Sequence, residues 1–145
     1  MAVDEINGKG GILARAVALA VEDSTSSDAG TAVQTARKLI DNDKVDFLLG
    51  NSNAAMALAI AQVSNEKGVL QIVPGGHTDA VTGANCHWNV FRVCNTTQME
   101  ANAVVASLIK QYGKKFYYLR TDYAFGHTLE AGMAKASAPL GPAAI

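Results

Sequence analysis

Residues 45–73 read VDFLLGNSNAAMALAIAQVSNEKGVLQIV and decide the fold class of the chain. Val45–Leu49 and Val69–Val73 are short apolar runs, which are typical of strands buried on both faces of a sheet. Between them, Ala54–Lys67 is rich in alanine and ends just before Gly68, the residue expected immediately after a helix. A strand, a helix and a second strand in this order favour a parallel sheet with helices on its faces.

The same alternation continues upstream. Val17–Val21 is another apolar run and predicts a strand that ends at Glu22. Residues 32–40 carry apolar side chains at helical spacing, and Asp28 is the expected N-cap of that helix.

It also continues downstream. Thr97-Gln98-Met99-Glu100 fits the capping-box pattern and predicts a helix that Gly113 ends. Phe116–Leu119 predicts a fourth strand. A last helix is expected to start near His127 and to be broken by Pro139.

The composition describes one packed domain of 145 residues, since 49% of them are hydrophobic and 17% are charged. Lys and Arg total 12 against 13 for Asp and Glu, so there is no basic stripe and nucleic acid is excluded as a partner. No apolar stretch approaches the roughly 20 residues that a membrane span needs. Met1–Asn7 lacks the basic start and apolar stretch of a signal peptide, so none is expected in this chain.

The sequence offers no pattern for catalysis. Gly8-Lys9-Gly10-Gly11 follows an expected helix end rather than a strand and does not fit the dinucleotide-binding fingerprint or a P-loop. There is no Gly-x-Ser-x-Gly elbow, and His77 has no recognisable carboxylate or cysteine partner for a metal site or a triad. The chain is therefore expected to be no enzyme and to need no cofactor or metal.

Several short segments follow one another in a characteristic order along nearly the whole chain: residues 2–7, 10–12, 21–23, 31–40, 45–50, 74–76, 82–83, 90–93 and 122–126. In this order and spacing they resemble the branched-chain amino-acid and amide group of type I periplasmic binding proteins, the extracytoplasmic receptors of ABC importers. The resemblance implies a receptor of two lobes, each a flavodoxin-like, three-layer α/β lobe around a parallel sheet, that close on a small polar solute.

By this resemblance the chain is a partial first, ligand-binding lobe over residues 1–137, followed by a frayed tail over residues 138–145. The leading strand of the lobe and the whole second lobe are missing. In the strand order 2-1-3-4-5 the leading strand lies between the strands at Val17 and Val45. Its absence is expected to leave unpaired sheet edges, marginal stability and self-association of the chain.

In proteins with an open parallel sheet, ligands bind beyond the carboxyl ends of the strands, where loops lead into helices. The first such loop offers Ser52, Asn53 and Ala54 as ligand residues. The family commonly has a hydroxyl at positions like Ala54 or Ala55, so here backbone amides, Ser52 or Asn53 must replace it. A simpler alternative is that Asn51 to Asn53 only cap the following helix.

Two more loops contribute to the expected site. In the first, the glycines Gly75 and Gly76 allow close approach of the backbone, and His77 or Thr78 can donate a hydrogen bond to the ligand. In the second, which contains Tyr123 and Phe125, an aromatic ring is expected to cover the ligand. Surface exposure of His77 and core packing of Tyr123 are the corresponding structural alternatives.

The remaining notable side chains are assigned structural roles. Trp88 and Tyr117 are expected to pack in the interior, and Arg92 to tie down a loop. Cys86 and Cys94 lack redox or zinc spacing, which leaves either two thiols or, in an exported receptor, a small-loop disulfide.

The expected function is that of the solute-binding component of an ABC importer, periplasmic or extracytoplasmic in the full-length protein, with a membrane permease as its partner. It would capture an amino acid, an amide or a related small solute by lobe closure. Two alternatives stay open: an amide- or amino-acid-sensing receptor or regulator, and a fragment without function.

Overall fold

The computed structural model describes residues 2–25 and 27–141. Within them, three short parallel strands form one sheet in the order β1 (Phe47–Leu49), β2 (Leu70–Val73) and β3 (Val90–Arg92). Phe47 pairs with Leu70, and Ile72 pairs with Phe91. The predicted parallel α/β architecture and two of its predicted strands are confirmed, whereas β3 is expected only from the family resemblance.

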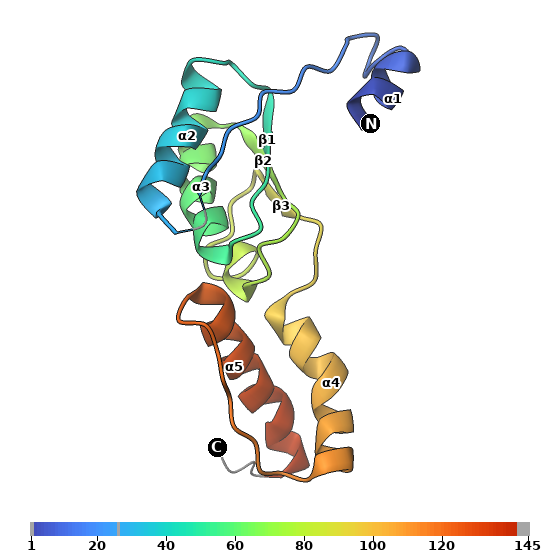
Figure 1. The fold of residues 1–145 in the computed structure, drawn as a ribbon, viewed down its shortest axis with the longest axis vertical. Coiled ribbons are helices and arrows are strands. Elements are labelled where there is room, and N and C mark those ends of the chain that lie inside the picture. The colour runs from blue at the N-terminus through green and yellow to red at the C-terminus, as the bar shows by residue number, and fades with distance from the viewer. Residues whose placement is uncertain (1, 26, 142–145) are drawn as a thin grey trace.

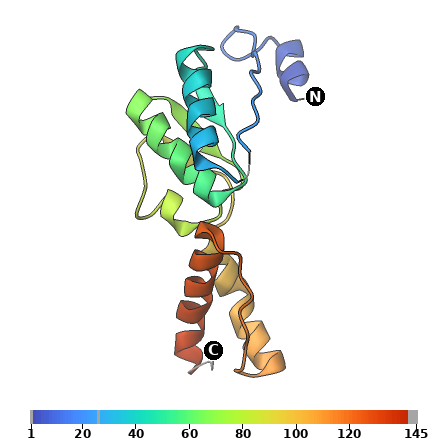
Figure 2. The ribbon, with the colours of Figure 1, turned by 60° about the vertical axis from the view of Figure 1, so that its left-hand side comes forward.

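Helices α2 (Ala29–Asp41) and α3 (Ala54–Lys67) lie together on one face of this sheet (Figures 1 and 2). The core lies between these layers, where small and branched side chains allow close packing. Two clusters of buried residues make up this core. The first, which includes residues of α2, consists of Ala32, Ala36, Ile40, Leu48, Met56, Ile60 and Val63. The second, which includes residues of β2 and β3, consists of Ala57, Ala61, Val73, Val81 and Val90.

Helix α2 begins at its predicted N-cap, and α3 begins and ends where the sequence predicts. Asp28 accepts hydrogen bonds from the Gly30 and Thr31 amides at 2.9 and 3.1 Å and caps α2. The Thr31 hydroxyl, followed by these amides, lowers the pKa of Asp28 below its usual range. Gly68 ends α3 in a left-handed conformation with φ of 68°, which glycine adopts without a steric penalty.

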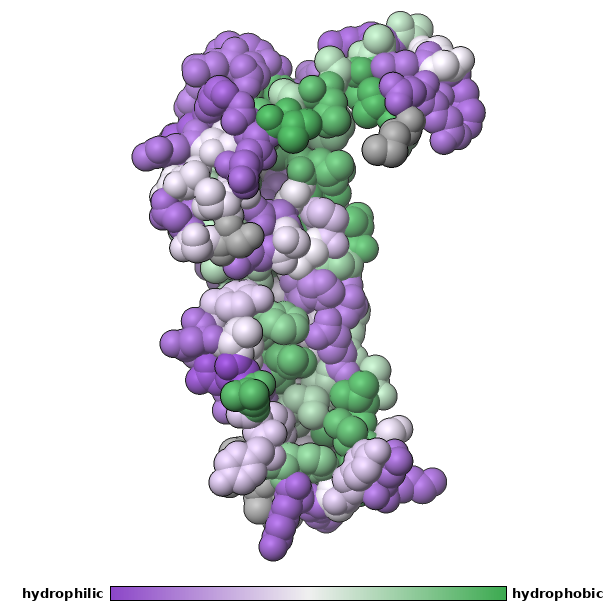
Figure 3. Space-filling view, viewed as in Figure 1, coloured by the Kyte–Doolittle hydropathy of each residue, from purple (hydrophilic) through white to green (hydrophobic). Residues whose placement is uncertain are grey.

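The opposite face of the sheet carries apolar side chains and no helix within the described residues. Phe47, Leu49 and Phe91 are exposed there, Leu49 at 65%. Figure 3 shows hydrophobic residues gathered along the strands on this side. β1 pairs only with β2, so its other edge is free in the described part of the chain.

Helices α4 (Thr97–Tyr112) and α5 (Ala124–Ser137) pack against each other beyond the sheet (Figure 1). A short helix, η1 (Asp79–Val81), precedes β3 and meets the start of α4, because Thr97 Oγ1 donates a hydrogen bond to Asp79 Oδ2 at 3.0 Å. The N-cap of α4 is Thr96, because its side chain accepts a hydrogen bond from the Met99 amide. The prediction of a capping box that starts at Thr97 was wrong by one residue.

The end of the chain follows the prediction with one shift. α5 begins at Ala124, three residues earlier than expected, and ends before η2 (Ala138–Leu140), which contains Pro139. The expected frayed tail falls partly on η2, and residues 142–145 lie outside the described residues. The boundary at residue 137 stays a prediction.

Two predicted strands do not form. Val17–Val21 and Phe116–Leu119 have no regular secondary structure, and Leu19, Tyr117 and Leu119 are exposed. A strand needs a neighbour for its backbone hydrogen bonds, and neither segment has one in the described chain. Helix α1 (Ala2–Gly8) buries none of its residues and lies apart from the sheet (Figure 1).

Candidate ligand-binding site

The loops after β1 and β2 meet at the same edge of the sheet, because both strands run in the same direction. They are in direct contact: a Cβ atom on Gly75 would lie only 2.9 Å from Ser52 Cα. A residue with a side chain at position 75 would push the two loops apart, so glycine is required here.

A cavity of about 260 Å³ lies at this edge. Its lining comes from both loops, from α4 and from the segment that leads into α5: Ser52, Ala54, Gly75, His77, Glu100, Tyr123 and Phe125. Six of these seven residues are among the nine ligand residues that the sequence predicted. The structure thus brings together side chains that are up to 73 positions apart, from Ser52 to Phe125.

His77 and Glu100 form a pair inside this cavity. His77 Nδ1 lies 2.7 Å from Glu100 Oε1, and both side chains are about two-thirds buried or more, with 31% and 27% exposed. Asn95 Nδ2 donates a second hydrogen bond to the same oxygen at 2.6 Å. His77 therefore has the carboxylate partner that sequence reasoning did not find.

Aromatic rings form one wall of the cavity. The His77 and Phe125 rings are edge to face, with centroids 6.1 Å apart and planes at 81°, a favourable arrangement for aromatic pairs. Tyr123 and Phe125 have centroids 6.2 Å apart. That Phe125 covers the ligand stays a prediction.

Three predicted ligand residues do not line the cavity. Asn53 Oδ1 accepts from the Ala55 and Met56 amides, so this side chain is the N-cap of α3. Gly76 lies on the core, where a Cβ would be 2.9 Å from the Ala57 Cβ. Thr78 is fully buried and caps η1.

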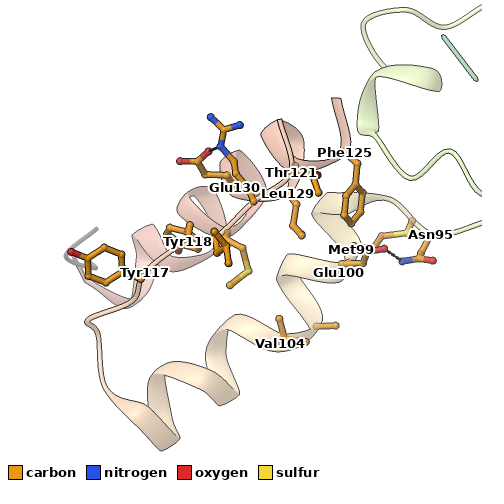
Figure 4. Close-up of a pocket in the computed structure, with 15 residues that line it drawn as sticks. Asn95, Met99, Glu100, Val104, Tyr117, Tyr118, Thr121, Phe125, Leu129 and Glu130 are labelled. Carbon is orange, nitrogen blue, oxygen red and sulfur yellow. Dashed lines mark hydrogen bonds and ion pairs between the residues drawn. The ribbon is translucent and has the colours of Figure 1, made fainter. Parts of the chain in front are cut away.

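A larger cavity of about 830 Å³ runs along the inner face of α4 and α5 (Figure 4). Figure 4 shows Leu129 and Val104 directed into it from the two helices, with Tyr117 and Tyr118 on the connecting segment. Glu100 and Phe125 line both cavities, so the two are adjacent. The smaller cavity is the candidate site, because polar groups from separate loops converge there.

Other predicted roles have mixed outcomes. Arg92 ties down the loop after β2, as expected, by donating to the carbonyls of His77 and Thr78 at 3.4 and 2.8 Å. Trp88 and Tyr117 do not pack in the interior: Trp88 is 74% exposed and Tyr117 is fully exposed. Cys86 and Cys94 are free thiols in the structure, at an exposed and a half-buried position.

No metal site or membrane-spanning helix is found among residues 2–25 and 27–141. These residues contain no group of three or more His, Cys, Asp and Glu side chains placed to hold a metal ion. None of their helices is both long and apolar enough to cross a membrane.

The comparison with solved structures returns the same fold. A periplasmic binding protein from Burkholderia mallei superposes with a TM-score of 0.88 at 28% sequence identity, covering 97% of this chain and 38% of that one. A solute-binding protein of an ABC transporter from R. palustris, solved in complex with benzoate, gives a TM-score of 0.83 at 29% identity over 92% of this chain and 37% of that one.

The comparison of sequences points the same way. The Leu/Ile/Val-binding protein BraC3 of Rhizobium johnstonii is 30% identical over 140 residues, which is 90% of this chain and 37% of BraC3. The chain thus spans less than two fifths of the length of each of these three relatives. The family described as periplasmic binding protein matches residues 1–145, and the chain belongs to this family.

Proposed function

We propose that this chain is part of the solute-binding receptor of an ABC importer and that its solute is a small carboxylic acid, such as an aliphatic amino acid or an aromatic acid. The observation that carries the proposal is the 260 Å³ cavity in which His77, the start of α3 and an aromatic wall converge. Its size and its mixture of polar and aromatic lining suit one small molecule.

Each part of the cavity has a distinct role in this proposal. The N-terminus of α3 at Ala54 lines the cavity, and the positive end of the helix dipole favours a negative charge there. Ser52 and His77 supply hydrogen-bonding side chains beside it. Phe125 and Tyr123 cover the apolar part of the solute, where van der Waals contact is favoured over exposure to water.

The chemistry of the relatives supports a carboxylate ligand. BraC3 is named for leucine, isoleucine and valine, and the R. palustris protein was solved with benzoate. These molecules differ in their apolar parts and share a carboxylate. A receptor that contains this chain would bind the carboxylate at the loops after β1 and β2 and the apolar part of the solute at the aromatic wall.

The proposed role is transport rather than catalysis, because the chain belongs to the periplasmic binding protein family. The receptor would bind and release the solute unchanged. Binding between the loops of the sheet and the α4–α5 pair would favour a closed conformation of the extracytoplasmic receptor, and a permease in the membrane would recognise this conformation.

The test is a thermal-shift screen with amino acids, benzoate and its hydroxylated forms, short amides and urea, on this 145-residue chain and on the full-length receptor. A solute at about 100 times its Kd should stabilise the receptor by about 2.7 kcal/mol, a rise of several degrees in Tm. A shift with carboxylic acids in the full-length receptor supports the proposal. Shifts with none of these compounds in either protein would leave the sensing or non-functional alternatives.

A further inference from the structure

The His77 imidazole is held in one orientation. Its backbone carbonyl accepts hydrogen bonds from the Thr97 amide at 2.9 Å and from Arg92 Nη1 at 3.4 Å. Its ring meets the Phe125 ring edge to face, and its Nδ1 lies 2.7 Å from Glu100 Oε1. These contacts come from three different elements, so the ring has little freedom to turn.

The hydrogen bond with Glu100 decides which nitrogen faces a ligand. Glu100 Oε1 already accepts from Asn95 Nδ2 at 2.6 Å, so it is an acceptor toward His77 as well, and Nδ1 carries the proton. A carboxylate on one ring nitrogen fixes the tautomer in this way. Nε2 is left for a solute, and in the neutral ring it has a lone pair and no proton.

A neutral His77 is unsuited to a carboxylate. Nε2 would present an acceptor to another acceptor, and the negative charge of Glu100 would lie close behind the ring. Protonation of Nε2 reverses both effects, since it creates a donor and brings the net charge of the His77–Glu100 pair to zero. A charge-assisted hydrogen bond to the solute then becomes available.

We infer that binding of a carboxylate at this site is coupled to uptake of a proton by His77 Nε2, and that Glu100 is the positioning residue that holds the ring with this nitrogen free for the solute. The inference rests on the proposed function, because it concerns the acid group of the solute. A solute that presents a donor at this place, such as a primary amide, binds the neutral ring and takes up no proton.

Other charged groups near His77 are engaged elsewhere. Asp79, on the same loop, accepts from Thr97 Oγ1 at 3.0 Å and from the Gln98 amide at 3.4 Å. Arg92 donates to backbone carbonyls, and Tyr123 lines the cavity without a hydrogen bond to the ring. Among the described residues, Glu100 is the charged group that hydrogen bonds to the imidazole.

Titration calorimetry of the full-length receptor measures the coupling directly. Benzoate and leucine are titrated at a series of pH values in buffers of different ionisation enthalpy, so that the buffer-dependent heat counts the protons taken up. We expect up to one proton per bound carboxylate and a Kd that rises up to tenfold per pH unit. Benzamide and leucinol, which lack the carboxylate, should show no uptake.

Three variants locate the proton. His77→Gln keeps a donor but cannot titrate, so proton uptake should vanish. Glu100→Gln replaces the carboxylate that fixes the ring tautomer with an amide, so the proton uptake and the affinity for the carboxylate solute should both fall. His87→Gln, at a half-buried position outside the cavity, is the matched control and should behave as the wild type.

The outcomes are distinguishable. A carboxylate that binds without proton uptake, or with uptake that persists in His77→Gln, overturns the inference and leaves the proposed function intact. A wild-type receptor that binds no carboxylate overturns both.

Discussion

Gly68 determines where α3 ends and β2 begins. Its φ of 68° lies in the left-handed region, and the Val69 amide that follows it donates to the Ser64 carbonyl at 3.0 Å. A Cβ at Gly68 would meet no atom within 4 Å, so a substitution changes the backbone preference without a clash.

Gly68→Ala should therefore destabilise the chain by about 1 kcal/mol, the cost of a left-handed conformation for a residue with a Cβ. Chemical denaturation followed by circular dichroism measures it. Gln62→Ala, on the exposed side of the same helix, is the control and should change the stability by less than about 0.5 kcal/mol. Equal stabilities of the two variants would contradict the role of Gly68.

At the scale of single residues, local signals predicted well and distant partners could not be predicted. Asp28 and Gly68 are recognised because a cap involves neighbours in sequence. Glu100 fits a capping box by local spacing, yet its carboxylate bonds to His77, 23 positions away. No spacing rule reports a contact that only the folded chain creates.

Among the secondary-structure elements, α2 and α3 are joined by ion pairs as well as by the core. Arg37 Nη2 lies 2.6 Å from Glu66 Oε2, and Lys67 Nζ lies 2.8 Å from Asp41 Oδ1. The hydrogen bond from Arg37 lowers the pKa of Glu66 below its ordinary 4.5, and the one from Lys67 lowers the pKa of Asp41 below its ordinary 3.8.

A carboxylate with a lowered pKa stabilises the fold above its ordinary pKa, and the effect is lost as the pH falls through the lowered value. Glu66→Gln should therefore lower Tm slightly at neutral pH, since the pair is exposed, and the difference from the wild type should close below about pH 4. Thermal melts from neutral to acidic pH measure this. A difference that is constant across the series would show that the charge of Glu66 is not responsible.

The α4–α5 pair depends on a close approach at Gly132. A Cβ there would lie 3.3 Å from both the Ala101 Cβ and the Thr97 carbonyl oxygen, so the helices touch at this point. Gly132→Leu should destabilise the pair by about 1–3 kcal/mol through overpacking, as measured by loss of helical signal on heating. Ala131→Leu, on the exposed side of α5, is the matched control. Equal melts for both variants would argue against this packing.

Helices were predicted more reliably than strands for a physical reason. α2, α3 and α4 satisfy their backbone hydrogen bonds internally, so their own residues suffice. Val17–Val21 and Phe116–Leu119 have strand-like sequences but need a neighbour. β3, with only three residues, is fixed by its pairing with β2 rather than by its own pattern.

At the scale of the whole molecule, the sheet has a free edge and an open apolar face. β1 has one neighbour in the described chain, and Leu49 is 65% exposed beside that edge. Exposed edges of apolar strands are templates for pairing with another chain. This geometry is the reason to expect self-association of the 145-residue chain, which stays a prediction.

Sedimentation velocity at increasing concentration should show the chain associating, and Leu49→Lys should reduce the association by placing a charge at the edge. Gln62→Lys adds the same charge on the helical surface and should have little effect. A monodisperse wild-type monomer over the whole concentration range would contradict the prediction.

The proposed function requires that the loops after β1 and β2, His77 and Phe125 hold a small carboxylic acid. Calorimetric titration of the full-length receptor with leucine and benzoate tests it most directly, comparing the wild type with Phe125→Ala and with the control Trp88→Ala, which changes an exposed aromatic residue away from the cavity. We expect saturable one-to-one binding of at least one acid, weakened about tenfold or more by Phe125→Ala, which corresponds to about 1.4 kcal/mol, and unchanged by Trp88→Ala. Absence of binding, or binding that both variants leave unchanged, would contradict it.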